Sequence, residues 1–400
     1  LLMTFSVGAL AVPDGTLSQF AAYLSASFGV KASPQAIHDR IDASAAEFMR
    51  LCLAKALAAC LRPLPLKRSL VESFSHIYII DSTNFQLDPA LVASFKGAGG
   101  ASSPAAMRIQ LVVDYITGRL HVELGDATLC DAPTLERLVA SAALPHDGNC
   151  LYLADLGYFK TATYQRLSSA EGQYFLSKLN FSAQLKNSDG DAIELEKVLC
   201  DDLDMPVWLG SSEVRLLSMR LPDDVAEARI RKAEEAARCK RKGSISASYR
   251  RFLHFSVFIS NLPHGFDMHL MHELYRIRWQ IELVFKSWKS ILKIHKIRSA
   301  RPERVLCEVC GKLVVAALSS LACCLAEATL DRQVISPFRA LKHLRTVAGR
   351  WSDSILRSAQ AHAEFLSDLA MEMARLCKKS SRGKTPNLEM RLQKARLKSP

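Results

Sequence analysis

The residues with the clearest potential for chemistry lie at 275–293, a segment that we predict to be one amphipathic helix. At about 100° per residue, one arc of this helix is apolar, and the opposite arc carries cations, a phenol and a single acid. The polar arc consists of Tyr275, Arg278, Glu282, Lys286, Lys289 and Lys293. A lone carboxylate among cations is expected of a metal ligand beside a polyanion. A solvated helix with ion pairs at three- and four-residue spacing is the alternative.

Two further acids follow apolar runs that have the character of buried strands. Asp81 comes after the apolar start of the run at 76–85, and Asp155 follows the run at 150–154. A buried carboxylate is costly unless it is paired or binds a metal, and ligand sites in open α/β sheets gather at strand ends. For Asp81, a simple turn with residues 82–84 is the alternative.

The elements around these acids follow a recognisable order. Strands are predicted at 76–85, 107–115 and 120–124, with a hairpin turn at 117–118, and a helix at 131–143 precedes the strand at 150–154. Three strands, a helix and a fourth strand with an acid at its tip are the order of a ribonuclease H-like core. We therefore expect an α/β fold.

Helical periodicity is lost after this core, and short strand-like runs indicate a β-rich insertion at 172–262. A basic segment at 229–242 interrupts these runs, as a solvated helix and loop or as a second DNA contact. The glycine-rich loop at 97–100 lacks a following Gly-Lys-Ser/Thr, which argues against a nucleotide-binding P-loop.

The two ends of the chain are predicted to be helical. Residues 16–28 and 33–41 are either a helix-turn-helix, with His38 and Arg40 facing outward, or an ordinary helical hairpin. Further helices are expected at 304–328, 337–347 and 355–377.

The predicted divisions are a helical N-terminal region at 1–70, a first catalytic part at 71–171, the insertion at 172–262, a second catalytic part with Glu282 at 263–330, C-terminal helices at 331–378 and a basic tail at 379–400.

Charge is unevenly distributed along the 400 residues, whose net charge is +12. Residues 286–400 contain 23 Lys or Arg residues but only 9 Asp or Glu residues, which indicates one polyanion-binding region, most simply for nucleic acid. A merely soluble surface usually mixes its signs.

Composition also argues against a membrane protein and a disulfide scaffold. The most apolar run, at 313–326, contains Ser319 and Ser320 and is short for a membrane span. Eleven cysteines without a framework pattern fit a reducing compartment, and the lone pair Cys307 and Cys310 is expected to be buried or idle. No secretory signal is apparent, although a start at Leu1 leaves room for an upstream piece.

The spacing Tyr275, Arg278, Glu282 and Lys289 resembles the Y-R-E-K signature of bacterial insertion-sequence transposases, the DDE transposases of the IS-four type. Residues 155–159, Asp-Leu-Gly-Tyr-Phe, resemble the D-x-G-Y-F motif of that family, and residues 81–83 resemble its D-[DS]-T motif. The loop at 97–100 and the hairpin at 114–118 also resemble the family, and the resemblance covers roughly residues 16–330.

This resemblance implies a ribonuclease H-like catalytic domain with a β-rich insertion between the second Asp and the Glu. Asp81, Asp155 and Glu282 are then the catalytic triad and hold two Mg²⁺ ions, with Mn²⁺ as a substitute, Asp81 bridging both. The implied enzyme cleaves DNA at terminal inverted repeats and joins the freed ends to target DNA. The resemblance points to a cut-and-paste reaction through a hairpin, without a covalent protein–DNA intermediate.

The resemblance also implies partners and contacts. Tyr275, Arg278 and Lys289 would hold phosphates near the cleaved end, and Lys286 and Lys293 share their arc as additional contacts. Better-known members of the family stack a flipped base on a tryptophan at the position of Phe255. Phenylalanine at this position is a departure from the family, and weaker stacking is expected there. A homodimer would bridge two DNA ends in a bacterial cytoplasm, nucleoid-associated when bound, with no membrane partner.

Three other readings compete with this one. A catalytically inactive, transposase-derived DNA-binding protein or repressor would bind without cutting. A structure-selective nuclease with a ribonuclease H-like core would cut without regard to a terminal sequence. A helical interaction protein would show no salt-sensitive DNA binding at all.

Overall fold

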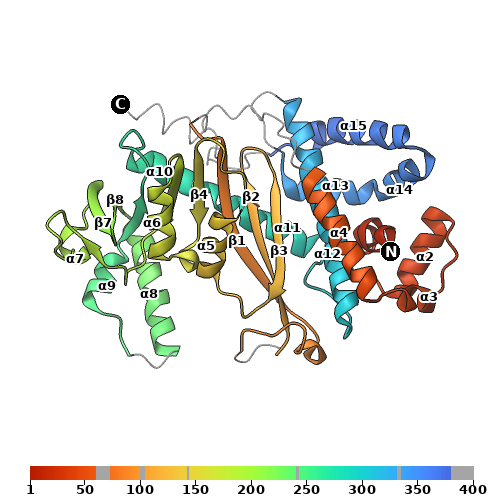
Figure 1. Ribbon diagram of the computed structural model, residues 1–400, viewed down its shortest axis with the longest axis horizontal. Helices are drawn as coiled ribbons and strands as arrows, with labels where there is room; N and C mark the ends of the chain where they lie inside the picture. Colours follow the sequence, from red (N-terminus) through yellow and green to blue (C-terminus); the bar gives the residue numbers. More distant parts are fainter. Residues whose placement is uncertain (60–72, 100–103, 142–143, 240–242, 331–334, 380–400) are drawn as a thin grey trace. The chain divides into compact units, whose positions relative to one another are not determined.

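The computed structural model describes residues 1–59, 73–99, 104–141, 144–239, 243–330 and 335–379 (Figure 1). The chain divides into two compact units. The first contains Leu1–Val71, Asp81–Cys130 and Trp279–Thr385, and the second contains Glu72–Ile80, Asp131–Arg278 and Pro386–Pro400, as far as these ranges are described.

Within the described residues, the strands form one mixed sheet of nine strands, in the order β3-β2-β1-β4-β5-β9-β8-β7-β6. Their bounds are β1 His76–Gln86, β2 Ala106–Asp114, β3 Leu120–Asp126, β4 Cys150–Ala154, β5 Gln173–Lys178, β6 Leu185–Lys186, β7 Leu203–Leu209, β8 Ser212–Arg220 and β9 Phe255–Ser260. β1 runs parallel to β4, and β4 runs parallel to β5, whereas β2 with β3 and the pairs from β5 to β6 are antiparallel. The fold class is therefore mixed α/β, as predicted.

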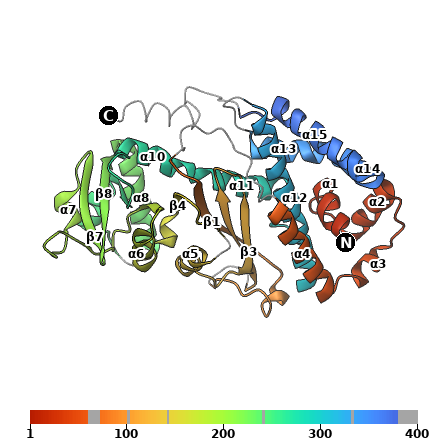
Figure 2. The same ribbon diagram turned by 45° about the horizontal axis from the view of Figure 1, so that its top comes forward.

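The first unit is mainly helical. Its helices are η1 Thr4–Gly8, α1 Ala9–Ala11, α2 Leu17–Phe28, α3 Pro34–Asp39, α4 Ala43–Ala59, η2 Pro89–Leu91, α11 Trp279–Ser290, α12 Pro302–Ala328, α13 Pro337–Thr346, α14 Ala348–Arg357 and α15 Ala359–Leu376. α12 is the central helix, against which η1, α4 and α15 pack (Figure 1). α14 packs on both α2 and α15 (Figure 2).

α12 owes its central place to an apolar sequence on all sides. It is long and apolar enough to cross a membrane by length and composition, but 78% of its most apolar stretch is buried in the protein. Gly311 allows η1 to approach closely, because a Cβ atom there would lie 2.0 Å from the carbonyl oxygen of Phe5. α12 is a core helix, as the sequence predicts for 313–326.

The second unit combines sheet and shorter helices. These are α5 Asp131–Ala140, η3 Leu156–Tyr158, α6 Thr161–Ser169, α7 Leu195–Val198, α8 Asp223–Cys239, α9 Ala247–Phe252 and α10 Met268–Ile277. The predicted strand-like runs of the insertion correspond to β5, β7, β8 and β9. The basic segment at 229–242 belongs to α8 as far as Cys239, and residues 240–242 lie outside the described residues.

Helix caps explain why the N-terminal elements begin and end where the sequence predicts. Thr16 caps α2 and forms a capping box with Gln19, and Gly29 ends this helix with a φ of 64°. Ser33 caps α3, with Pro34 in its first turn. The two predicted helices are confirmed.

Two helix predictions are wrong. The segment 275–293 is not one helix, because α10 ends at Ile277, α11 begins at Trp279 and ends at Ser290, and the Arg278 N–H bonds the carbonyl of Tyr275 only three residues back. The helix predicted at 355–377 is likewise divided, because Ser358 is extended and caps the new helix α15. The predicted tail lies outside the described residues beyond residue 379.

Candidate active site

Two acids of the predicted triad line one hollow in the first unit. Asp81 comes from β1 and Glu282 from α11, and the hollow has a volume of about 550 Å³. The other residues that line it are Ser82, Thr83, Phe285, Lys286, Lys289 and Ser290. We call this opening the charged hollow. It gathers carboxylates and lysines from segments that lie far apart in the sequence.

β1 presents Asp81 because burial stops at that residue. Residues 76–80 are buried, and Asp81 and Ser82 are half-buried. The Asp81 carboxylate accepts the backbone N–H of Ser82 at 2.8 Å, and the Gln110 side-chain amide donates to the Asp81 carbonyl at 3.0 Å. The acid therefore stands on a fixed backbone with its carboxylate reaching the opening.

α11 presents Glu282 in its first turn, where the helix dipole favours an acid, and Lys289 in its last turn, where it favours a base. Lys286 and Lys289 follow Glu282 at spacings of four and seven, so all three lie on one face. Lys293 departs from this face. It lies beyond the end of α11 with a φ of 49°, and its carbonyl accepts a hydrogen bond from Lys312 at 3.2 Å.

Asp155 belongs to the second unit and follows β4 directly. Ala154 and Ile80 are Cα partners in the parallel ladder of β4 and β1, and each is followed in the sequence by an acid, Asp155 and Asp81 respectively. Asp155 is exposed, and Arg278 Nε lies 4.0 Å from one of its carboxylate oxygens. A guanidinium and a carboxylate thus lie close together in this unit.

Tyr275 differs from the prediction, because it is buried instead of facing outward. Its hydroxyl donates to the Ala154 carbonyl at 3.3 Å, and its ring packs edge-on against Phe258. Burial raises the pKa of Tyr275 far above its usual value, so the phenol stays neutral. Tyr275 therefore anchors the end of α10 beside Asp155 and the Arg278 guanidinium, which lies 5.9 Å from the centre of its ring.

One cation beside Tyr275, Lys178, is not singled out by the sequence, whereas Arg229 begins the basic segment at 229–242. Lys178 Nζ lies 5.6 Å from the centre of the Tyr275 ring, and burial, followed by the Arg229 charge, lowers the pKa of Lys178. Arg229 donates to the Phe255 carbonyl at 3.2 Å. The sequence signal for Lys178 is weak, because a single cation near the end of a strand-like run, here 174–179, is common.

The aromatic side chains differ in accessibility. Phe255, expected to stack a base, is buried at the start of β9. Trp279, the first residue of α11, is 56% exposed. An exposed tryptophan next to Arg278 in the sequence is suited to stack on a base, and the helical pattern alone did not indicate its exposure.

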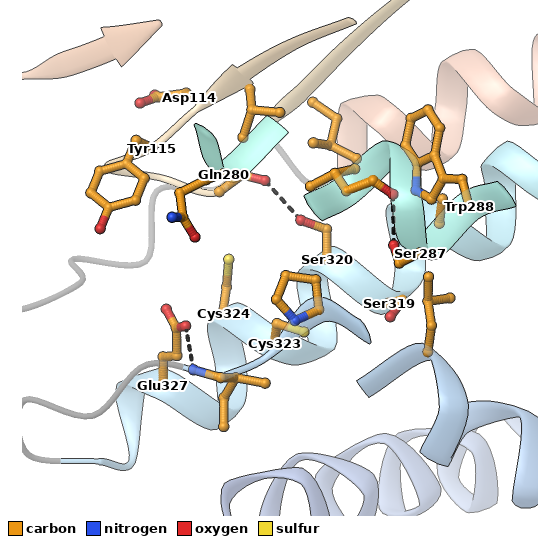
Figure 3. Close-up of a pocket in the computed structure, with 18 residues that line it drawn as sticks. Asp114, Tyr115, Gln280, Ser287, Trp288, Ser319, Ser320, Cys323, Cys324 and Glu327 are labelled. Carbon is orange, nitrogen blue, oxygen red and sulfur yellow. Dashed lines mark hydrogen bonds between the residues drawn. The ribbon is translucent and has the colours of Figure 1, made fainter. Parts of the chain in front are cut away.

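The other face of α11 lines a second hollow in the first unit, which we call the apolar hollow (Figure 3). Gln280, Val284, Ser287 and Trp288 contribute from α11, and α12 supplies Ser319, Ser320, Cys323 and Cys324. Its volume is about 120 Å³. Serine hydroxyls there are hydrogen-bonded to backbone carbonyls, Ser320 to Gly118 at 2.9 Å and Ser287 to Val284 at 2.7 Å.

Metal-ligand chemistry can be judged from the donors present. In the described part of the chain, no group of three or more His, Cys, Asp or Glu side chains is arranged to hold a metal ion. Asp81 and Glu282 nevertheless supply the charged hollow with the hard oxygen donors that Mg²⁺ prefers. Cys307 and Cys310 are buried, and burial raises their pKa values to about 11 and about 12, as expected for idle thiols.

Comparison with known proteins gives consistent matches. Residues 72–318 match the family model described as Transposase DDE domain. The chain is 29% identical over 361 residues to the transposase for insertion sequence element IS1151 of Clostridium perfringens, covering 82% of this chain and 75% of that protein. It is 27% identical over 327 residues to the transposase for IS231B of Bacillus thuringiensis subsp. berliner, covering 75% and 67%. A putative transposase InsL for IS186A of Escherichia coli K12 is 30% identical over 106 residues.

Proposed function

Because the chain belongs to the Transposase DDE domain family, we propose that it cuts the DNA strands at the ends of its own insertion sequence and transfers them to a target. A transposase is a DNA-cleaving and strand-transferring enzyme. The observation that carries the assignment of residues is the charged hollow, where Asp81 and Glu282 lie with Lys286 and Lys289.

The catalytic domain is proposed to be ribonuclease H-like. The strand order β3-β2-β1-β4, with β1 and β4 parallel, supports this, as do the positions of the acids, since Asp81 follows Ile80 in β1 and Asp155 follows β4. β7, β8 and β9 fall between Asp155 and Glu282 in the sequence, where the β-rich insertion is expected. The divisions at 71–171, 172–262 and 263–330 are part of the same proposal, as is the helix-turn-helix within 1–70.

The proposed metal ligands are Asp81, Asp155 and Glu282. Divalent cations, Mg²⁺ or Mn²⁺, would activate the attacking oxygen and stabilise the leaving oxygen when bound. Donor chemistry supports this, since two carboxylates line one hollow and Asp155 follows the strand paired with β1. The three acids would hold the divalent metal ions, and the lysine and arginine side chains would hold the DNA phosphates.

The phosphate contacts divide between the two units. In the first unit, Lys286 and Lys289 lie at the charged hollow, with Lys293 just beyond α11. In the second, the Arg278 guanidinium suits bidentate phosphate binding, with Tyr275 holding its helix in place. Lys178 adds positive charge beside Tyr275, and Arg229 adds positive charge near Lys178. A flipped base would stack on the exposed Trp279, or on Phe255 if DNA binding makes the buried ring of Phe255 accessible.

The proposed reaction alternates hydrolysis of DNA with strand transfer. Hydrolysis breaks one phosphodiester bond at each element end and leaves a 3′-hydroxyl. This hydroxyl attacks the opposite strand, which releases the flanking DNA and closes a hairpin. A second hydrolysis reopens the hairpin, and the 3′-hydroxyl then attacks target DNA in line. The homodimer that bridges two ends, and its place on nucleoid DNA in a bacterial cytoplasm, belong to the same proposal.

The test is cation-dependent nicking of DNA that carries the terminal inverted repeat, which sequencing of the flanking DNA would identify. Wild-type protein should nick this DNA with Mg²⁺ or Mn²⁺, and Glu282→Gln should bind it without nicking. Binding without nicking by the wild-type protein would favour the catalytically inactive DNA-binding protein or repressor. Nicking irrespective of the terminal sequence would favour a structure-selective nuclease.

A further inference from the structure

Two polar side chains are buried on one face of β2, beside the acid of the charged hollow. Arg108 is 6% exposed and Gln110 is 4% exposed. They are two residues apart in a strand, so both side chains point to the same face. A guanidinium and an amide buried in a strand are costly unless hydrogen bonds satisfy them, so their partners define what these residues do.

Both side chains donate hydrogen bonds to β1, at two consecutive residues. Gln110 Nε2 donates to the Asp81 carbonyl at 3.0 Å. The Arg108 guanidinium donates to the Ser82 hydroxyl at 2.7 Å and to the Leu129 carbonyl at 2.5 Å. Arg108 thereby links the side chain of Ser82, the residue after the acid, to the loop that follows β3.

The contacts continue to the carboxylate itself. The Ser82 N–H donates to the Asp81 carboxylate at 2.8 Å, so the group held by Arg108 belongs to the residue that orients the acid. Asp81 and Ser82 line the charged hollow, whereas neither Arg108 nor Gln110 is among the residues that line it. Arg108 and Gln110 therefore act on Asp81 from outside the charged hollow and do not touch a ligand in it.

We propose that Arg108 and Gln110 are positioning residues, which fix Asp81 in the orientation that a divalent cation requires. This rests on the proposed role of Asp81 as a metal ligand. Ligating carboxylates need supporting hydrogen bonds, because a ligand free to turn loses affinity for the ion. Gln110 fixes the carbonyl of the acid, and Arg108 fixes Ser82, whose N–H holds one carboxylate oxygen.

The experiment measures nicking of terminal-repeat DNA as a function of Mn²⁺ and Mg²⁺ concentration. Gln110→Leu and Arg108→Met should each raise the half-maximal cation concentration by about 10- to 100-fold, the usual effect of removing a group that supports a metal ligand. The rate at saturating cation should fall much less. Arg108→Lys keeps one donor for Ser82 and should recover part of the loss.

A double-mutant cycle separates positioning from general stability. If Arg108 acts through Ser82, the effects of Arg108→Met and Ser82→Ala on the half-maximal cation concentration will not add. Ser82→Ala and the shorter amide in Gln110→Asn also serve if the larger changes prevent folding. The matched control is Gln173→Leu. Gln173 is a buried residue of β5 whose side chain accepts a hydrogen bond from the Tyr152 hydroxyl, and its replacement should lower stability without shifting the cation dependence.

Unchanged half-maximal cation concentrations in folded Arg108 and Gln110 variants would overturn the inference, as would an equal shift in Gln173→Leu. Additive effects of Arg108→Met and Ser82→Ala would remove Arg108 from it. A wild-type protein that fails to nick with either cation would instead count against the proposed function. The two failures are therefore distinguishable.

Discussion

The charged hollow and the apolar hollow use the same helix in opposite ways. On one face of α11, Glu282 and Lys286 meet Asp81 of β1 at an opening of about 550 Å³. On the other face, Val284 and Trp288 meet residues of α12 and α13 around a space of about 120 Å³. The first face presents charged side chains to a ligand, and the second buries apolar side chains that hold the helix in place.

The difference shows how a half-buried carboxylate can reach an opening and yet be held firmly. Charged groups that must meet a ligand cannot be packed, so their helix has to be fixed from its other side. Trp288 is 2% exposed and packs edge-on against Phe285, with ring centres 5.8 Å apart. Substitutions on the charged face should therefore change chemistry, and substitutions on the apolar face should change stability.

The largest expected effect is at Glu282. Glu282→Gln keeps the size of the side chain but removes the charge that holds a divalent cation, a contribution of several kcal/mol that corresponds to a loss of about 10³-fold or more in nicking rate. Single-turnover nicking of terminal-repeat DNA measures it. Glu303→Gln is the matched control, since Glu303 also lies half-buried in the first turn of a helix, α12. Equal losses in both variants would remove Glu282 from the chemistry.

Trp288 should give the next largest effect, and on stability instead of rate. Trp288→Ala removes a buried ring from the apolar hollow and should lower the free energy of unfolding by about 3–5 kcal/mol, as measured by urea denaturation. Trp279→Ala is the control on the same helix, and its exposed side chain should change stability by less than about 0.5 kcal/mol. Similar values for the two would mean that the apolar face does not hold α11.

The sequence allowed these faces to be predicted only in part. The sequence predicts β4 with its correct bounds. Asp81 and Asp155 stand out because acids directly after apolar runs are unusual, and Glu282 stands out as the single acid on a cationic arc. Periodicity could not reveal that Tyr275 is buried, because its partners Ala154 and Phe258 come from distant strands. A helical pattern fixes which residues share a face, but the packing partner decides whether that face is exposed.

The break between α10 and α11 escaped prediction for a similar reason. Arg278 keeps helical dihedral angles, and no glycine or proline marks the position. The polar pair Arg108 and Gln110 did leave a signal, as two polar residues at alternate positions in an apolar strand. That signal indicates burial with partners only once the neighbouring strand is known, since an exposed strand face has the same pattern.

Lys312 supports the end of α11 and provides a pH-dependent test. It is 1% exposed, donates to the Lys293 carbonyl, and burial lowers its pKa to about 8, with Glu308 and Asp14 acting in the opposite direction. Between pH 8 and the unfolded value of 10.5, the unfolded chain binds the additional proton. The free energy of unfolding should therefore rise with pH in this window, by up to about 1.4 kcal/mol per unit.

Comparison with Lys312→Met isolates this contribution from other groups that titrate in the same range. Urea denaturation at several pH values should give a difference between the two proteins that changes between pH 8 and 10.5 and is constant at lower pH. A constant difference throughout would mean that Lys312 has an ordinary pKa in the folded protein. The supporting role of the Lys293 contact would then have to be tested by activity alone.

The smallest expected effects concern the lysines of the charged hollow. Lys286→Ala and Lys289→Ala should each remove about one phosphate contact, which reduces the slope of log binding constant against log salt by about 1 and weakens DNA binding at low salt. Stability should hardly change, because Lys286 is exposed. Lys342→Ala, an exposed lysine of α13 that lines neither hollow, is the control. If it lowers the slope equally, DNA binding follows total positive charge and not the face of α11 that carries Glu282.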